Sequence, residues 1–229
     1  MFISATAFFN THHPPAPLPE PRFAHPHLCF TNHDIDPNGW HVIKQPIWYP
    51  DHPFGPRLQS KIPKFLLHRY IPDVSWYAWH DYNQKVSLNP KLVVADLESE
   101  HLILGVFRHS KRDCAYDEAR KVRGKRDHIV NIDRAISYLI ENRHPTNAGL
   151  FELTSFYRKN VPSLNLLFEE LVNLLFRITS RDQILFPLLM NTHQINNYKI
   201  FPGSAQAHSG GGNVYFEQFI PPLVATIPK

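Results

Sequence analysis

The sequence predicts an α/β protein with a mainly parallel central sheet flanked by helices. Short apolar runs rich in β-branched and aromatic residues alternate with segments of helical periodicity. The clearest of these runs, residues 74–79, leads directly to an acidic residue, Asp81. In open α/β sheets the carboxyl ends of the strands form the edge where ligands bind. Hydrophobic residues make up 43% of the 229 residues, which is enough for a full core.

Three strands are expected early in the chain, at residues 2–9, 28–31 and 40–44. Pro-rich loops separate them, because proline lacks the backbone donor that a sheet requires. A helix is expected over residues 57–70, where Pro63 marks a break or a first turn. The strand at 74–79 follows this helix.

The second part of the chain is richer in helices. Asn89 and Pro90 predict the start of a helix that runs to Glu98, because Asn caps helices well and Pro suits the first position. Further elements are expected as a strand at 102–107, helices at 114–122 and 128–142, a strand at 150–157 and an amphipathic helix at 163–178. Ser180 is expected to cap a last helix that reaches Leu189. No strand is assigned to the tail beyond it.

Composition limits the classes of function. We interpret residues 1–229 as a single domain, with a nucleotide-binding half at about 1–110 and an acceptor half at about 111–229. The net charge of +4 suits an anionic ligand such as a nucleotide diphosphate, and the scattered basic residues give no reason to expect nucleic acid. Two cysteines without short spacing form no zinc signature. No apolar run approaches the ~20 residues of a membrane span and no signal peptide is recognisable, so the expected location is cytoplasmic.

Asp81 and Asn83 form the main candidate motif. They lie two residues apart after a buried strand, so both can direct oxygen atoms to one point. Hard oxygen ligands suit Mg²⁺ or Mn²⁺, and such an ion can hold a diphosphate. The competing interpretation is an ordinary turn, in which Asp and Asn are common.

Seven short stretches occur in a fixed order along the chain: Thr6-Ala7, Cys29 to Asn32, Asn38 to Trp40, Ser60 to Arg69, Trp79 to Asn83, His109 to Cys114, and Ser180 to Gln183. Together they resemble the glycosyltransferase-like domain of plant proteins of seed mucilage and turgor control, and of related bacterial and viral proteins. That family usually has Asp in place of Asn32, and Ile-Asp-Gly-Asn in place of His80-Asp81-Tyr82-Asn83. The resemblance implies a GT-A type fold and a metal-dependent glycosyltransferase with Mn²⁺ or Mg²⁺. It would move a sugar from a nucleotide-sugar donor, with UDP as the expected nucleotide, to a hydroxyl of a glycan or other acceptor.

The resemblance and the residue chemistry together assign roles to individual residues. The metal ligands would be Asp81 and Asn83, with His208 or His193 as a third. The donor would contact Thr6, Ala7, Asn32, Lys61, Lys64, His68 and Asp81. The sugar would contact His109, Arg112, Asp113, Arg181 and Gln183.

Asp182 is the candidate catalytic residue. Its position at a helix N-terminus favours the ionised carboxylate. It would act as a base in an inverting transfer, or stabilise an oxocarbenium-like centre in a retaining one.

Each role has a structural alternative. Lys61 and Lys64 suit a solvated basic face, His68 a buried hydrogen-bonded histidine, and Asp113 a helix cap. Two other functions stay open: a catalytically degenerate nucleotide- or carbohydrate-binding domain, and a phosphate-ester hydrolase that uses Asp81 as a metal ligand. The absence of G-x-x-x-x-G-K-[ST], G-x-G-x-x-G and G-x-S-x-G argues against P-loop, Rossmann dinucleotide and common serine hydrolase functions.

Overall fold

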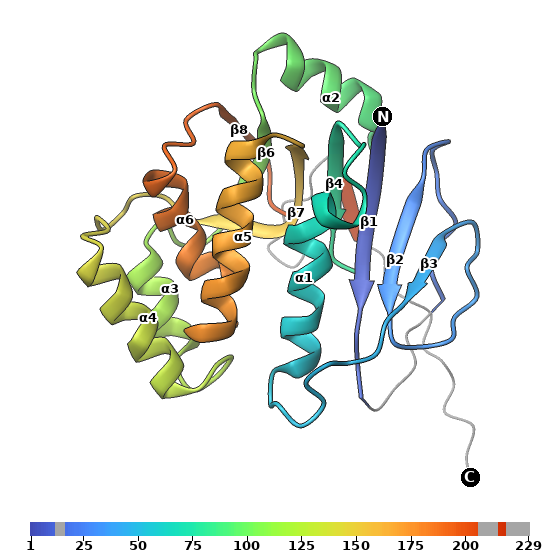
Figure 1. The fold of residues 1–229 in the computed structure, drawn as a ribbon. Coiled ribbons are helices and arrows are strands. Elements are labelled where there is room, and N and C mark those ends of the chain that lie inside the picture. The colour runs from blue at the N-terminus through green and yellow to red at the C-terminus, as the bar shows by residue number, and fades with distance from the viewer. Residues whose placement is uncertain (12–16, 206–214, 219–229) are drawn as a thin grey trace.

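A computed structural model describes residues 1–11, 17–205 and 215–218, and the structural statements below concern these residues. A seven-stranded sheet runs through the molecule in the order β3-β2-β1-β4-β7-β6-β8 (Figure 1). Its strands are β1 (Phe2–Phe8), β2 (His27–Thr31), β3 (His41–Lys44), β4 (Trp76–His80), β6 (Leu104–Arg108), β7 (Phe151–Lys159) and β8 (Tyr198–Phe201). A separate two-stranded sheet pairs β5 (Gln84–Val86) with β9 (Phe216–Gln218).

The large sheet is mainly parallel. The pairs β1–β2, β2–β3, β1–β4 and β6–β8 are parallel, whereas β7 is antiparallel to both of its neighbours, β4 and β6. The predicted α/β class and mainly parallel sheet flanked by helices are therefore confirmed. The strands β5, β8 and β9 were not predicted, because segments of three or four residues carry almost no periodicity.

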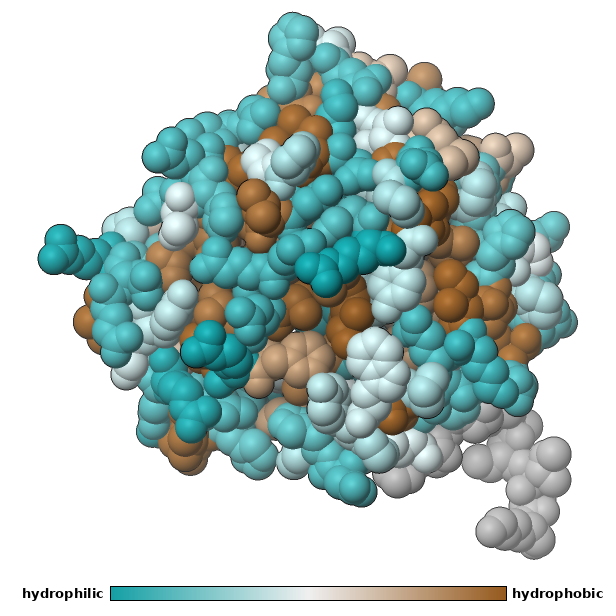
Figure 2. Space-filling model, viewed as in Figure 1, coloured by the Kyte–Doolittle hydropathy of each residue, from teal (hydrophilic) through white to brown (hydrophobic). Residues whose placement is uncertain are grey.

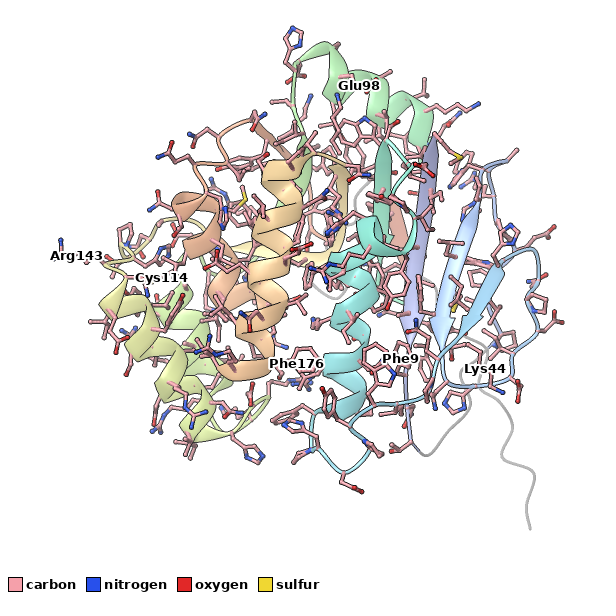
Figure 3. The ribbon with its side chains drawn as sticks, viewed as in Figure 1. Phe9, Lys44, Glu98, Cys114, Arg143 and Phe176 are labelled. Carbon is pink, nitrogen blue, oxygen red and sulfur yellow. The ribbon has the colours of Figure 1, made fainter. Side chains whose placement is uncertain are left out.

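The six predicted helices are confirmed, with ends that differ by a few residues. They are α1 (Gly55–Tyr70), α2 (Pro90–Ser99), α3 (Ala115–Val122), α4 (Ile129–Glu141), α5 (Pro162–Arg177) and α6 (Asp182–Thr192). Helices α1 and α5 lie side by side over one face of the sheet, and α3, α4 and α6 group beyond its β7 side (Figure 1). Lys44 on β3 and Arg143 after α4 mark opposite sides of the molecule (Figure 3).

Three helices, α1, α2 and α6, test the predictions about helix caps and helix breaks. The Asn89 side chain accepts a hydrogen bond from the backbone N–H of Lys91 at 3.1 Å, which confirms the predicted cap of α2. Helix α1 continues through Pro63, and its non-helical residue is Leu66, at φ −110° and ψ 25°. The predicted Ser180 cap is wrong: α6 begins at Asp182 after Arg181, and no side-chain hydrogen bond caps it. The reason is that the Ser180 hydroxyl donates to the Asp127 carboxylate instead, at 2.9 Å.

The two faces of the sheet have separate cores, and both enclose β4. On the face beneath α1 and α5, the rings of Phe65, Phe156 and Phe168 stack with centroids 5.4 to 6.1 Å apart. On the other face Trp76 belongs to a cluster with Tyr157. Burial on both sides suits a central strand of a mainly parallel sheet. It also holds the end of β4, and therefore the position of Asp81, in place.

The surface mixes polar and apolar residues. On the face viewed in Figure 2, hydrophobic patches lie between hydrophilic side chains. In the part of the chain that the structure describes, no helix combines the length and apolar character needed to cross a bilayer.

Candidate functional site

Asp81 lies directly after β4, as the sequence predicted. Its backbone N–H donates to the carbonyl of Thr154 at 2.8 Å, and its carbonyl accepts from the N–H of Gln84 at 2.9 Å, which closes a turn. Tyr82 fits this turn because its φ is not positive, so no glycine is required there. The Tyr82 ring packs against Phe8 at a centroid distance of 5.0 Å. The substitution of the family's usual glycine therefore leaves Asp81 at the edge of the sheet.

One oxygen of Asp81 is held by two donors. Its Oδ1 accepts from the indole Nε1 of Trp79 at 3.0 Å and from Nζ of Lys64 at 3.3 Å. The side chain is nevertheless 40% exposed. Within the described residues its other oxygen, Oδ2, has no hydrogen-bond partner. Asp81 is thus fixed in orientation and still open to a ligand.

The structure brings four of the predicted site residues into one lysine–aspartate cluster: Lys61, Lys64, Asp81 and Asp182. The Nζ of Lys61 lies 2.7 Å from Oδ2 of Asp182. The Nζ of Lys64 lies 3.4 Å from the same oxygen and 3.3 Å from Asp81 Oδ1, so it bridges the two carboxylates. Lys61 on α1 reaches Asp182 at the start of α6 across 121 residues of the chain. The tertiary fold, and not proximity along the chain, therefore builds this cluster.

Burial and mutual attraction set the protonation of the cluster. Burial alone would raise the pKa of Asp182, but Lys61 and Lys64 hold that pKa well below its usual range. Burial lowers the pKa of Lys61 to about 8, against the attraction of Asp182. Burial also opposes the charge on Lys64, but Asp81 and Asp182 raise the pKa of that lysine. Asp182 is therefore ionised at neutral pH, and the two lysines beside it are the main reason.

Arg181 and Gln183, which flank Asp182, line a cavity of about 530 Å³. We call it the basic cavity, because six of its lining side chains are cationic: Lys111, Arg112, Lys121, Lys125, Arg126 and Arg181. His109 and one carboxylate, Glu118, also line it. The predicted sugar contacts His109, Arg112, Arg181 and Gln183 thus meet in one place.

Glu118 holds the two arginines of the basic cavity. It is 2% exposed, and its Oε2 lies 2.6 Å from Nη2 of Arg112 and accepts from Nε of the same residue at 2.7 Å. Its Oε1 accepts from Nη2 of Arg181 at 3.4 Å. Two guanidinium groups therefore share one buried carboxylate. Glu118 was not singled out from the sequence, although it falls among Ala115, Ala119 and Val122 on the buried face of α3.

Asp113 lies apart from the other predicted sugar contacts. Arg112 pairs with Glu118, whereas Asp113 is exposed and does not line the basic cavity. Nor does Asp113 cap α3, since Cys114 occupies the cap position. The side chain of Asp113 precedes the helix, while Glu118 lies one turn inside it on the face that meets the arginine.

Asp127 anchors the loop that carries Lys125 and Arg126. Its Oδ2 accepts from the hydroxyl and the N–H of Ser180 at 2.9 and 2.7 Å, and from the hydroxyl of Thr179 at 2.8 Å. These hydrogen bonds, with one from Asn131, outweigh burial and lower the pKa of Asp127. The loop is thereby tied to the turn before α6. Sequence reasoning missed Asp127, because nothing near it in the chain marks it as buried.

Other predicted donor contacts lie elsewhere. His68 bonds Glu169 at 3.0 Å and Arg158 at 3.2 Å, so it is the buried, hydrogen-bonded histidine of the structural alternative. The amide of Asn32 accepts from the N–H of Asn10 and donates to its carbonyl, at 3.1 and 2.8 Å. Thr6 and Ala7 are buried in β1, and the Thr6 hydroxyl has no hydrogen-bond partner among the described residues.

Of the predicted metal ligands, Asp81 and Asn83 lie on the same turn, and Asn83 is exposed. His193 bonds Glu170 at 2.7 Å beyond the far end of α6, and His208 lies outside the described residues. In the described ranges no three His, Cys, Asp or Glu side chains form a group suited to a metal ion.

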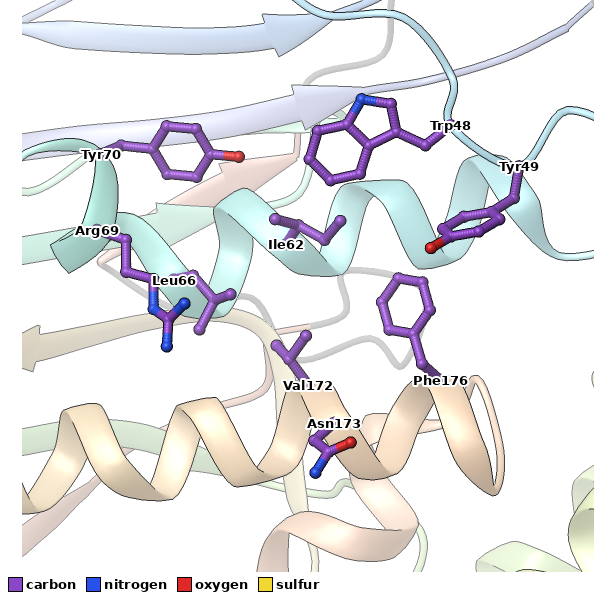
Figure 4. Close-up of a pocket in the computed structure, with 9 residues that line it drawn as sticks. All are labelled: Trp48, Tyr49, Ile62, Leu66, Arg69, Tyr70, Val172, Asn173 and Phe176. Atoms are coloured by element: carbon purple, nitrogen blue, oxygen red, sulfur yellow. The ribbon is translucent and has the colours of Figure 1, made fainter.

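A second cavity of about 530 Å³ lies between α1 and α5 (Figure 4). Aromatic side chains of Trp48, Tyr49, Tyr70 and Phe176 form much of its wall. Its one charged side chain, Arg69, is already paired with Glu169 at 2.9 Å. The titratable groups gather instead at the lysine–aspartate cluster and the basic cavity, which we take as the candidate active site.

The chain is similar to known glycosyltransferase-like proteins. A family model described as the TOD1/MUCI70 glycosyltransferase-like domain matches residues 38–202, which include both charged regions. The probable hexosyltransferase MUCI70 of Arabidopsis thaliana is 31% identical over 141 residues. That match covers 57% of this chain, and the chain spans about a quarter of the relative, at 24% of its length.

Two solved glycosyltransferase structures have low similarity. Mouse xyloside xylosyltransferase 1 in its apo form superposes with a TM-score of 0.47 at 11% identity, covering 87% of this chain and 84% of its own. The apo bifunctional glycosyltransferase WbbM gives a TM-score of 0.48 at 10% identity, covering 87% of this chain and 38% of its own. The family match and the curated relative carry the assignment, and they confirm the predicted glycosyltransferase class at the level of the family. The chain belongs to the TOD1/MUCI70 family of glycosyltransferase-like domains.

Proposed function

We propose that this domain moves a sugar from a nucleotide-diphosphate donor, with UDP as the nucleotide, to a hydroxyl group of an acceptor. The observation that carries the proposal is the lysine–aspartate cluster at the carboxyl end of β4. There Asp81 is oriented by Trp79 and Lys64, yet its side chain is 40% exposed. Family membership supports the reaction class.

The proposal includes a divalent cation, Mn²⁺ or Mg²⁺, held by Asp81. Mg²⁺ is commonly held by one or two carboxylates together with substrate phosphates, so a complete protein cage is not required. The exposed carboxylate of Asp81 fits this pattern, and Asn83 follows it on the same turn. When bound, the cation would neutralise charge on the departing nucleotide diphosphate.

The cluster's other residues have roles that follow from their charges. Lys61 and Lys64 supply two cationic groups beside Asp81, which suits a diphosphate. The lowered pKa of Asp182 makes that carboxylate a weak base, since efficient general bases have a pKa near the working pH. Asp182 therefore suits electrostatic stabilisation of a positively charged, oxocarbenium-like centre better than proton removal.

The catalytically degenerate nucleotide- or carbohydrate-binding domain is the second candidate. One observation favours it: Lys64 already compensates the charge of both carboxylates, at 3.3 and 3.4 Å. A domain of this kind would bind the donor without turnover.

The test is a thermal-shift panel of UDP, GDP and several nucleotide sugars, each with and without Mn²⁺. The proteins are the wild type, Asp81→Ala and the control Asp73→Ala, which removes an exposed carboxylate before β4. A ligand at 100 times its dissociation constant stabilises by about 2.7 kcal/mol. We expect a UDP compound to stabilise the wild type and the control only with Mn²⁺, and Asp81→Ala to lose that effect.

Turnover then separates the two candidates. Release of UDP from a nucleotide sugar, measured with a panel of acceptors, is expected for the transferase. Binding without release in any condition would favour the degenerate domain. If no nucleotide raises the melting temperature with or without the metal, the proposed donor site is wrong.

A further inference from the structure

The cavity between α1 and α5 has no role in the proposed reaction (Figure 4). Its volume of about 530 Å³ falls within the range of ligand pockets, about 300 to 1,000 Å³. Among the described residues that line it, the one charged side chain is Arg69, which pairs with Glu169 at 2.9 Å. The cavity therefore offers a ligand no uncompensated charge. We call it the aromatic cavity, after four of its lining side chains: Trp48, Tyr49, Tyr70 and Phe176.

Helix α1 separates the aromatic cavity from the lysine–aspartate cluster. Ile62 and Leu66 of α1 line the cavity, whereas Lys61 and Lys64 of the same helix contact Asp182. At about 3.6 residues per turn, the two pairs lie on largely opposite sides of the helix. The residues that line the cavity include no member of the cluster. A ligand in the aromatic cavity is therefore separate from the proposed reaction centre.

The loop between β3 and α1 carries the two most exposed rings of the cavity. Three prolines stiffen residues 46–53 of this loop. The backbone N–H of Trp48 donates to Oε1 of the buried Gln59 at 3.4 Å. A Cβ on Gly55, at the start of α1, would collide with the Tyr49 carbonyl oxygen, so glycine allows this close approach. The backbone that carries the rings is thus held in place without a ligand, which lowers the entropy cost of binding.

The rings combine exposed apolar surface with free polar atoms. Trp48 and Tyr49 are 51% and 49% exposed, and the Tyr49 ring meets Phe176 at a centroid distance of 5.7 Å. Among the described residues, the Trp48 indole N–H, the Tyr49 hydroxyl and the Asn173 amide have no hydrogen-bond partner. A wholly apolar ligand or partner would take these groups out of water without replacing their hydrogen bonds, which is costly.

A sugar ring has the complementary chemistry. One of its faces consists of C–H groups, which can cover an aromatic ring, and its hydroxyls lie at the edge, where they can bond to indole, phenol and amide groups. We propose that the aromatic cavity binds a neutral sugar unit of a glycan chain, stacked on Trp48 and Tyr49 and bonded to Asn173. This site goes beyond the proposed function, because it holds a glycan on the domain and takes no part in the transfer.

The test measures the binding of neutral hexasaccharides without donor or metal. The probes are cellohexaose, xylohexaose, mannohexaose and galactohexaose, titrated by calorimetry. Trp48 supplies a second signal, since the other three tryptophans are at most 5% exposed: Trp40, Trp76 and Trp79. We expect at least one hexasaccharide to bind and to protect the tryptophan fluorescence from quenching by acrylamide.

Two substitutions separate ring stacking from general hydrophobic contact. Trp48→Leu keeps an apolar side chain without a flat ring, and should lose roughly tenfold or more in affinity. Trp48→Phe keeps a ring, and should lose less than about fivefold. The control Leu92→Ala removes a side chain on α2 that is 61% exposed, and should bind like the wild type. Both Trp48 variants should bind UDP with Mn²⁺ as the wild type does.

A second variant covers the case in which substitution of Trp48 disturbs the loop. Asn173 is exposed on α5, away from that loop, and Asn173→Ala removes one polar group of the cavity. It should weaken hexasaccharide binding roughly fivefold, with the melting temperature unchanged.

Three results would overturn the inference. The first is that no hexasaccharide binds the wild type. The second is unchanged affinity in Trp48→Leu and Asn173→Ala, which would place the sugar elsewhere on the protein. The third is a dimer in sedimentation velocity that Trp48→Leu dissociates, which would make the cavity an interface between two copies of the chain. Failure of UDP to bind contradicts the proposed function alone, since the hexasaccharide titrations contain no nucleotide.

Discussion

The lysine–aspartate cluster and the basic cavity both include residues at the start of α6, but their charges are balanced differently. In the cluster two lysines face two aspartates, and Lys64 and Asp182 are only 4% and 7% exposed. In the basic cavity one buried carboxylate, Glu118, lies among six cations, and the three lysines are all exposed. Charges that leave water need a nearby partner of opposite sign, whereas exposed charges remain hydrated. The cluster is therefore internally compensated, whereas the cavity retains an excess of positive charge.

Breaking the cluster should have the largest effect on stability. Asp182→Asn leaves Lys61 and Lys64 buried with a single remaining carboxylate, so we expect a loss of about 3 kcal/mol in the free energy of unfolding. If Asp182 acts as proposed, transfer activity should fall about 100-fold or more, because the substitution removes a charge at the proposed reaction centre. Urea unfolding and nucleotide release measure the two effects. Asp51→Asn, an exposed carboxylate, is the control, and equal stability of both variants would contradict the compensation described above.

Acid should remove the stabilising contribution of the Asp182 carboxylate to folding. The pKa of Asp182 in the folded protein lies below its ordinary value of 3.8, so its stabilising effect is complete above that pH and is lost as the pH falls below it. The stability difference between wild type and Asp182→Asn should therefore be constant at neutral pH and shrink below about pH 4. Urea unfolding at a series of pH values tests this, and a difference that persists unchanged at pH 2 would show that the carboxylate acts by shape rather than charge.

Loss of the Asp127 hydrogen bonds, which support the basic cavity, should have the next largest effect on stability. Asp127→Asn turns an amide donor, or a weaker acceptor, toward donors on Thr179 and Ser180, and we expect a loss of about 2 kcal/mol in unfolding free energy. Hydrogen exchange should increase at residues 123–127. Asp133→Asn is a matched control, because Asp133 pairs with Arg123 at the surface and should leave the urea midpoint nearly unchanged.

The exposed lysines of the cavity should matter least for folding. We expect Lys121→Gln/Lys125→Gln to change the free energy of unfolding by less than about 0.5 kcal/mol, since surface substitutions rarely do more. Urea unfolding against Lys44→Gln/Lys91→Gln checks this. A large loss of stability would mean that the cavity cations are paired within the protein, which would weaken the contrast between the two regions.

The sequence by itself determined the local elements and the position of Asp81. Apolar periodicity, together with helix-start residues such as Asn89 and Pro90, predicted the six helices and the long strands, because each pattern needs only neighbouring residues. Asp81 was predicted at the end of a buried strand because strand and acid adjoin in the chain. The order of short stretches also pointed to the family, which the family match confirms.

Only the tertiary structure decided which polar groups meet. Lys61 reaches Asp182 across 121 residues, and Thr179 and Ser180 reach Asp127 across 52 and 53. Polar side chains have no periodic signature, and their partners depend on how helices pack. For that reason Ser180 was expected to cap a helix, and Asp113 to lie with Arg112 among the sugar contacts, whereas packing gave each a different environment. Packing also decided that His68 is the buried, hydrogen-bonded histidine of the structural alternative. Packing of α3 against α6 also placed Arg181 beside five cations that lie within residues 111–126.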